Sequence, residues 1–200
     1  MSVNDPGYTE RLRRRSDVWW KRHLHTQAPY RWNLRRLEPG YVLDVGCGVG
    51  RNLEHVDGHG VGVDTNPTSV ARARAAGLTA YTPDEFGASP HALPRSFDTM
   101  LLAHVLEHMH RREAVELIAA YLPFVQIGGR VLVIVPQEAG FASDATHVEF
   151  LDADDVAGIL SDLDITVTGS SSFPFPRQVG RWFRYNETVV VGAVGPSGSR

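Results

Sequence analysis

The sequence is poor in cysteine, in long apolar runs and in net charge. Its single cysteine, Cys47, excludes a disulfide within the chain and any metal site built from several cysteines. No apolar run approaches the roughly 20 residues that cross a bilayer, and no apolar stretch of the signal-peptide kind follows the basic residues near the start. We therefore expect no signal peptide, no membrane span and a cytoplasmic location.

The formal net charge of −3 also argues against a general binder of nucleic acids, which needs a connected basic face. Arginines cluster at residues 11–15 and 171–187, but no nucleic-acid recognition motif accompanies them. We expect no nucleic acid partner. The 42% hydrophobic and 22% charged composition is ordinary for a globular domain, and 200 residues are enough for one sizeable core.

From residue 41 onward, apolar strands alternate with helical segments. Strands are predicted at residues 41–46, 60–64, 78–81, 96–103, 128–136, 164–172 and 186–194, and helices at 66–77, 111–122 and 151–163. This alternation predicts a doubly wound, Rossmann-like α/β fold with a seven-stranded sheet. Because no crossover helix separates the last two strands, we expect the last strand to be antiparallel.

Two further helices are predicted before the sheet, at residues 9–24 and 27–37. We expect a single domain over residues 1–195, in which 1–39 form a helical cap and 40–195 the Rossmann-like core, followed by a polar tail at 196–200. Local signals support two of the core helices: Asn66 and Asp152 are plausible N-caps, and Gly77 is a stop.

The stretch VLDVGCGVGRN carries glycines from a strand into a helix start, which favours binding of an anionic or polar ligand. Gly46, Gly48 and Gly50 give G-x-G-x-G, which departs from the dinucleotide pattern G-x-G-x-x-G. Asp44, just before these glycines, would repel a pyrophosphate and suits a cationic ligand. Asp64 closes the next strand, 18 positions after Gly46, where a carboxylate can accept both hydroxyls of a ribose. An NAD-linked oxidoreductase is disfavoured.

These motifs resemble those of class I S-adenosylmethionine-dependent methyltransferases. The resemblance spans residues 41–163, including GVDTNP, FDTMLLAHVLEHM and GGRVLVIVP in the expected order. It implies S-adenosylmethionine as cofactor, with its amino acid part over residues 46–50 and its ribose on Asp64. It also implies adenine near residues 82–86. The cofactor-binding residues it implies are Asp44, Gly46, Cys47, Gly48, Gly50, Asp64, Thr65, Asp84, Glu85 and Ala103, of which Asp84 or Glu85 would accept from the adenine amino group.

Histidines and acids follow the fourth and fifth predicted strands, whose carboxyl ends border the active sites of such sheets. They are His104, Glu107, His108, His110, Glu138, Asp144, His147 and Glu149. A cluster of this kind can act as a general base or hold a metal. We expect His147, His108 and His104 to be the catalytic candidates. His110 is expected to be a solvated residue at a helix start.

The segment HVLEH is similar to the E-x-x-E-H element that binds a divalent cation in ubiquinone-pathway O-methyltransferases. This resemblance implies a magnesium or other divalent cation on Glu107 and His108, with Asp144, followed closely by His147, supplying the missing ligand. His104 replaces the first Glu of the element, which departs from a magnesium site because imidazole is a softer ligand than carboxylate. In an alternative reading no metal binds, and the histidine packs under the donor or caps a helix.

The overall layout resembles that of small actinobacterial sugar O-methyltransferases, such as mannoside 1-O-methyltransferases of methylmannose polysaccharide biosynthesis. It implies O-methylation of a small polar acceptor, with a sugar favoured. The aromatic and arginine residues of 171–187 suit a sugar ring, but they equally suit a phenol or quinone, or can simply cover the sheet. A non-catalytic donor-binding module is the alternative of another class. The sequence does not indicate an oligomeric state.

Overall fold

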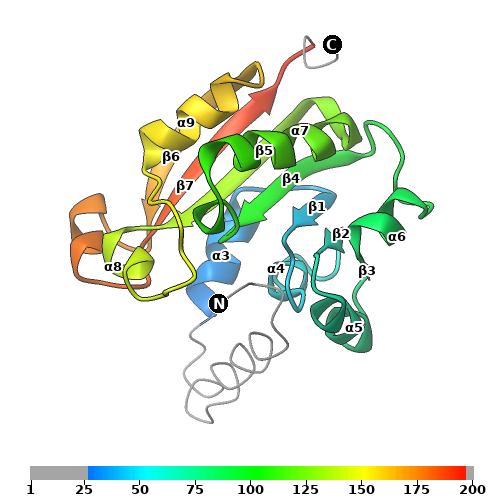
Figure 1. Ribbon diagram of the computed structural model, residues 1–200, viewed down its shortest axis with the longest axis horizontal. Helices are drawn as coiled ribbons and strands as arrows, with labels where there is room; N and C mark the ends of the chain where they lie inside the picture. Colours follow the sequence, from blue (N-terminus) through cyan, green and yellow to red (C-terminus); the bar gives the residue numbers. More distant parts are fainter. Residues whose placement is uncertain (1–26, 197–200) are drawn as a thin grey trace.

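The computed structural model describes residues 27–196. Its centre is a seven-stranded sheet with the strand order β3-β2-β1-β4-β5-β7-β6 (Figure 1). The strands are β1 Val42–Val45, β2 Gly60–Val63, β3 Ala80–Tyr81, β4 Phe97–Ala103, β5 Val125–Pro136, β6 Ile165–Phe173 and β7 Glu187–Val194. The predicted fold class is confirmed, and each predicted strand overlaps an observed one.

Strand direction also follows the prediction. The pairs β1–β2, β1–β4, β2–β3 and β4–β5 are parallel. β7 is antiparallel to both β5 and β6. Because β7 runs against its neighbours, its first residue lies at the edge where the parallel strands end, and Glu187 is paired with Pro136, the last residue of β5.

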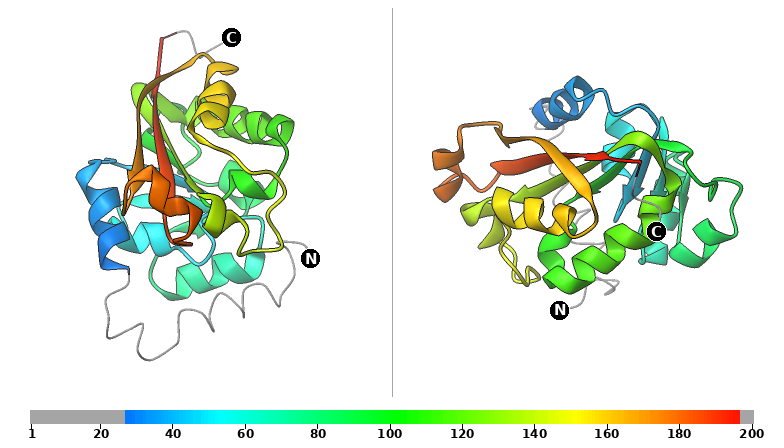
Figure 2. Two further views of the ribbon diagram at one scale, coloured as in Figure 1. Left: turned by 90° about the vertical axis from the view of Figure 1, so that its left-hand side faces the viewer. Right: turned by 90° about the horizontal axis from the view of Figure 1, so that it is seen from above.

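Helices cover both faces of the sheet. They are α3 Ala28–Arg36, α4 Arg51–His55, α5 Pro67–Ala75, α6 Pro83–Gly87, α7 Arg111–Tyr121, α8 Glu138–Phe141 and α9 Ala153–Ser161, with short 3-10 turns η1 Leu106–His108, η2 Leu122–Phe124 and η3 Arg177–Arg181. In Figure 2, α3 lies on one face of the sheet and α7 and α9 lie on the other.

The two faces carry separate apolar cores, as the alternation of side chains along a strand requires. Along β5, Val131 and Val133 belong to the core under α7 and α9, whereas Leu132 and Ile134 pack with Leu34 of α3. The second half of β5, residues 131–136, is therefore buried on both faces, which explains why its sequence there is a continuous apolar run.

Local caps set the helix boundaries that position the site. The Asn66 side chain accepts hydrogen bonds from the backbone N–H groups of Thr68 (3.0 Å) and Ser69 (3.3 Å) at the start of α5. Asp152 caps α9 in the same way. Both predicted caps are confirmed. α6 was not predicted, although Thr82 and Glu85 form a reciprocal capping box that the spacing T-x-x-E indicates.

The predicted helix at residues 27–37 is present as α3. The predicted helix at 9–24, and all but the first residue of the predicted tail at 196–200, lie outside the described residues. Over residues 27–196, none of the helices combines the length and the apolar character that crossing a membrane requires.

Candidate active site

The turn between β1 and α4 has a left-handed backbone conformation at three positions, which favours glycine. Gly46, Gly48 and Gly50 have φ values of 78°, 55° and 85°. A side chain at Gly46 would overlap Val105, whereas a Cβ at Gly48 would meet no atom within 4 Å. Gly46 is thus required for packing, while Gly48 leaves open space in which a ligand can approach the backbone.

Asp64, at the end of β2, fastens this turn to the neighbouring strand. One carboxylate oxygen accepts the Gly48 backbone N–H at 2.7 Å, and the other accepts the Asn66 N–H at 2.8 Å. Burial raises the pKa of Asp64, and the two N–H donors oppose this rise. Each oxygen keeps a further acceptor position, so the carboxylate can still receive two hydroxyl groups. Its neighbour Thr65 is exposed.

Asp44, at the middle of β1, is a buried carboxyl group with an incomplete set of partners. Its side chain is fully buried; Oδ1 lies 3.5 Å from Asn52 Nδ2, and Oδ2 has no hydrogen-bond partner within residues 27–196. Burial raises its pKa to about 7, against the effect of Asn52 and with a further contribution from Asp64. A buried carboxyl of this kind favours a cationic ligand, because a positive charge would offset the cost of ionising it.

The remaining residues predicted to contact the donor have distinct environments. Cys47 is buried, and burial raises the pKa of its thiol, so it is a packing residue rather than a nucleophile. Ala103 ends β4 and is half-buried. The Glu85 carboxylate already accepts from Arg74 Nη2 (2.7 Å) and the Thr82 N–H (2.8 Å). Of the two predicted adenine contacts, the exposed Asp84 is therefore the better candidate.

His104 follows β4 in a left-handed conformation, with φ of 59°. Its Nδ1 lies 3.2 Å from Glu107 Oε1, and its Nε2 lies 2.8 Å from Glu187 Oε1. Burial lowers the pKa of His104, but the carboxylates of Glu187 and Glu107 outweigh burial and raise it to about 10. Both nitrogens are engaged, so the geometry does not suit the predicted role of His104 as a base. It connects the end of β4 to the start of β7 instead.

His147 and His108 differ from His104, since each has only its Nδ1 in a hydrogen bond; His147 Nε2 lies 4.0 Å from Glu107 Oε1. His147 Nδ1 lies 2.7 Å from the Phe141 carbonyl oxygen, and His108 Nδ1 lies 3.1 Å from that of Thr146. A carbonyl only accepts, so Nδ1 is the donor in both rings, and the neutral imidazoles keep a lone pair on Nε2. The ring centroids are 4.9 Å apart.

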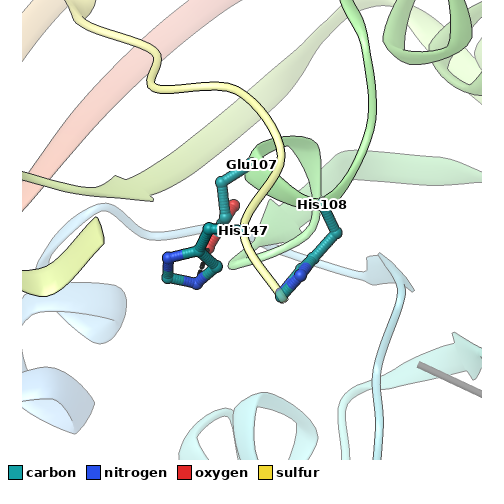
Figure 3. A group of neighbouring side chains, drawn as sticks. All are labelled: Glu107, His108 and His147. Atoms are coloured by element: carbon teal, nitrogen blue, oxygen red, sulfur yellow. Dashed lines mark ion pairs between the residues drawn. The ribbon is translucent and has the colours of Figure 1, made fainter. Parts of the chain in front are cut away.

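Glu107 completes this group (Figure 3). Its side chain is 1% exposed, and its Oε2 has no hydrogen-bond partner among the described residues. One ligand atom from each of Glu107, His108 and His147 lies within 4.8 Å of the other two. Of the predicted metal ligands, Glu107 and His108 belong to this group. Asp144 does not, because its Oδ1 accepts from the Thr146 N–H and hydroxyl and so shapes the loop that carries His147.

The aromatic and arginine-rich segment 171–187, called the cover below, is linked to this group through α8. Arg177 of η3 makes a two-pronged ion pair with Glu138 of α8, with both distances 2.7 Å. Phe141 of α8 in turn stacks on His147, with centroids 5.2 Å apart. The exposed large side chains of the cover are Phe175, Trp182 and Tyr185. Of the other predicted residues, His110 is exposed at the start of α7, as expected, and its Nδ1 lies 3.4 Å from Glu149 Oε2.

Glu187 is a site residue that the sequence reasoning missed. Its signal was its place among three polar residues, Asn186, Glu187 and Thr188, that precede the apolar run of a strand expected to be antiparallel. Such a strand begins at the edge where its parallel neighbours end, so its first side chain faces the same region as those that follow β4 and β5.

The strand order, the antiparallel β7 and a glycine turn tied to an acid after β2 define the class I methyltransferase fold. The chain matches the sequence profile of a family described as a methyltransferase domain over residues 12–168, and it belongs to this family. It is an S-adenosylmethionine-dependent methyltransferase. No curated protein sequence matches it.

Solved structures with low sequence identity share the fold. A SAM dependent methyltransferase from Archaeoglobus fulgidus is 16% identical with a TM-score of 0.66, and the match covers 88% of this chain and 100% of that one. Magnesium protoporphyrin IX methyltransferase from Synechocystis with bound SAH is also 16% identical with a TM-score of 0.66, covering 96% of both chains. A chain from the Haloferax volcanii complex of the Trm112 activator with a putative methyltransferase is 18% identical, with the same TM-score and coverage.

Proposed function

We propose that the chain transfers the methyl group of S-adenosylmethionine to a hydroxyl oxygen of a small polar acceptor, with a sugar such as a mannoside favoured. The observation that carries this proposal is the position of two groups of side chains. Asp44 and Asp64 belong to β1 and the end of β2, and the His108–His147 pair follows β4 and β5 at the same edge of the sheet. Donor and acceptor sites of open α/β sheets lie at this edge.

On the donor side, the cationic methionyl part lies over the glycine turn, where it offsets the charge of Asp44. The ribose hydroxyls donate to the acceptor positions that remain on Asp64, and Asp84 accepts from the adenine amino group. Cys47, Thr65 and Ala103 line this site. The open space over Gly48 supports this arrangement, since the donor can contact the backbone there.

On the acceptor side, His147 takes the proton. The acceptor oxygen attacks the methyl carbon, the bond from that carbon to sulfur breaks, and the sulfonium becomes the neutral thioether of S-adenosylhomocysteine. The proton of the hydroxyl passes to His147 Nε2, which is the nitrogen left free by the Phe141 carbonyl. His108 has the same tautomer and is the alternative base. Because the donor is already activated, alignment and proton removal are the main contributions of the protein.

A sugar is favoured because the cover, residues 171–187, presents aromatic faces beside charged groups. Phe175 and Tyr185 are 47% and 46% exposed, and Arg184 lies 4.9 Å from the Tyr185 ring. Aromatic faces contact the C–H faces of a pyranose, while charged groups bind its hydroxyls. A phenol contacts the same aromatic faces, so it belongs in the same assay.

The test is transfer from labelled S-adenosylmethionine to a panel of mannosides, other sugars and catechols. We expect transfer to a sugar by the wild-type chain and by His110→Gln, whose imidazole is exposed and lies beside Glu149. We expect loss of transfer in His147→Gln with donor affinity unchanged. Transfer to catechols alone would replace the sugar as acceptor. No transfer to any compound, despite tight donor binding, would favour a non-catalytic module and contradict the proposal.

A further inference from the structure

We infer that Glu107, His108 and His147 form a binding site for one transition-metal dication of the Zn²⁺ type, rather than for Mg²⁺. The three side chains come from η1 and from the loop after α8, and they point toward one another (Figure 3). The loop is fastened to η1 by the Val148 N–H, which donates to the Glu107 carbonyl at 2.7 Å. The ligand atoms are thus brought together by backbone contacts.

The two imidazoles are oriented by hydrogen bonds in the way that metal-bound histidines usually are. Such histidines donate one ring N–H to a carbonyl or carboxylate, which fixes the tautomer and turns the other nitrogen toward the ion. Here the carbonyls of Phe141 and Thr146 take this part for His147 and His108. His147 is 9% exposed in its side chain, so its Nε2 has little access to water as an alternative partner.

The carboxylate provides an independent observation. Glu107 is almost fully buried, yet one of its oxygens has no hydrogen-bond partner among residues 27–196. Leaving a buried carboxylate oxygen without a partner is costly. His104 holds the other oxygen, at 3.2 Å from Glu107 Oε1, and this contact fixes the orientation of the carboxylate. A dication between Glu107 and the imidazoles would satisfy the remaining oxygen.

The types of ligand atom, two imidazole nitrogens and one carboxylate oxygen, determine which metal fits the site. Magnesium prefers oxygen ligands and retains several waters, whereas two imidazoles with one carboxylate suit Zn²⁺, Co²⁺, Ni²⁺ or Fe²⁺. A glutamate at the first position of the HVLEH segment would add an oxygen ligand, but this chain has His104 there. Both nitrogens of His104 are engaged with carboxylates. Three protein ligands with an open position are typical of catalytic rather than structural zinc.

A bound ion of this type lowers the pKa of a hydroxyl that approaches it. This role rests on the proposed function, but the existence of the site does not. An ion and a proton compete for the same lone pair on His147. Activity with and without a chelator therefore separates the two roles of this side chain.

The experiment uses the full chain without an affinity tag, stripped with EDTA. Calorimetry with Zn²⁺ and visible absorption with Co²⁺ should both give one ion per chain, and millimolar Mg²⁺ should not displace it. We expect at least a tenfold loss of Zn²⁺ affinity in Glu107→Gln and in His147→Gln. His110→Gln should bind as the wild type does. A His23→Gln/His25→Gln chain should also bind normally, which would exclude the two N-terminal histidines as the source.

Far-ultraviolet circular dichroism and S-adenosylmethionine affinity show whether each variant is folded, and His108→Gln replaces either variant that is not. Unchanged Zn²⁺ binding in the folded site variants, or no stoichiometric binding by the wild type, would overturn the inference. The proposed function fails separately: Zn²⁺ binding without transfer to any sugar rejects only the sugar as acceptor, and transfer that persists in a chain unable to bind metal rejects only the role of the ion in catalysis.

Discussion

The Asp64 carboxylate accepts the backbone N–H of Gly48 at 2.7 Å, so the residue that follows β2 holds the preceding glycine turn in place. The same side chain is the proposed ribose acceptor. We therefore expect Asp64→Ala to weaken S-adenosylmethionine binding by at least about 100-fold, since two hydrogen bonds to a charged group are lost. Calorimetry would measure this, with the exposed Glu54→Ala of α4 as the control. Near-normal affinity in Asp64→Ala would refute its assignment.

Asp44→Asn should stabilise the chain without donor while weakening donor binding. The folded pKa of Asp44, about 7, is raised above the value of about 3.9 expected for an unfolded Asp. The stabilising contribution of this group is therefore fully present below pH 4 and is lost as the pH rises through 7. At pH 8 we expect the variant to gain about 1–3 kcal/mol in free energy of unfolding.

This gain should fade toward about pH 3, where the carboxyl is largely protonated in both states. Urea denaturation at the two pH values measures the gain, and calorimetry at pH 8 should show donor affinity about 10- to 100-fold lower, because the cationic partner is lost. A destabilised variant at pH 8 would show that Asp44 has a structural partner instead.

His104→Gln should destabilise the chain because it leaves the carboxylates of Glu107 and Glu187 without their shared donor. The expected loss is about 1–3 kcal/mol in free energy of unfolding. Glu107→Gln in the same chain should recover part of it, since the buried charge is removed. A double-mutant cycle by urea denaturation, with EDTA present throughout, tests this pair. Strictly additive effects of the two substitutions would contradict the coupling.

Arg177→Ala should change acceptor binding more than stability. The Arg177–Glu138 pair is about two-fifths exposed on each side, so its loss should cost less than about 1 kcal/mol. However, it joins η3 to α8, and α8 contacts His147 through Phe141. We expect the KM for the acceptor to rise several-fold with kcat nearly unchanged. Arg112→Ala, which breaks an exposed pair on α7, should alter neither constant.

The parts of the site that were predictable lie close together in the sequence. The glycine turn and Asp64 belong to one strand–helix–strand unit, and the caps Asn66 and Asp152 act within three residues. Sequence spacing is informative there because the residues are joined by short segments of regular structure, whose geometry is fixed. The fold and the contact between the glycine turn and Asp64 were therefore accessible from the sequence, while the donor contacts stay a prediction.

The acceptor half was less accessible because it is assembled over long separations. His147 rather than Asp144 joins Glu107, since Asp144 is turned to the Thr146 N–H in an irregular loop where no periodicity fixes direction. Likewise, His104 is paired with Glu187 at a separation of 83 residues. That contact depends on the placement of β7 beside β5, which no local pattern specifies.

The position of β7 has a consequence for how the molecule is assembled during synthesis. β7 follows the other strands in sequence, yet it lies inside the sheet between β5 and β6. Until it is made, β5 and β6 each present an unpaired edge, and His104 lacks one of its two carboxylates. The contact between Asp64 and the glycine turn needs only β1 and β2, whereas the contact between His104 and Glu187 must wait until the last strand has been inserted.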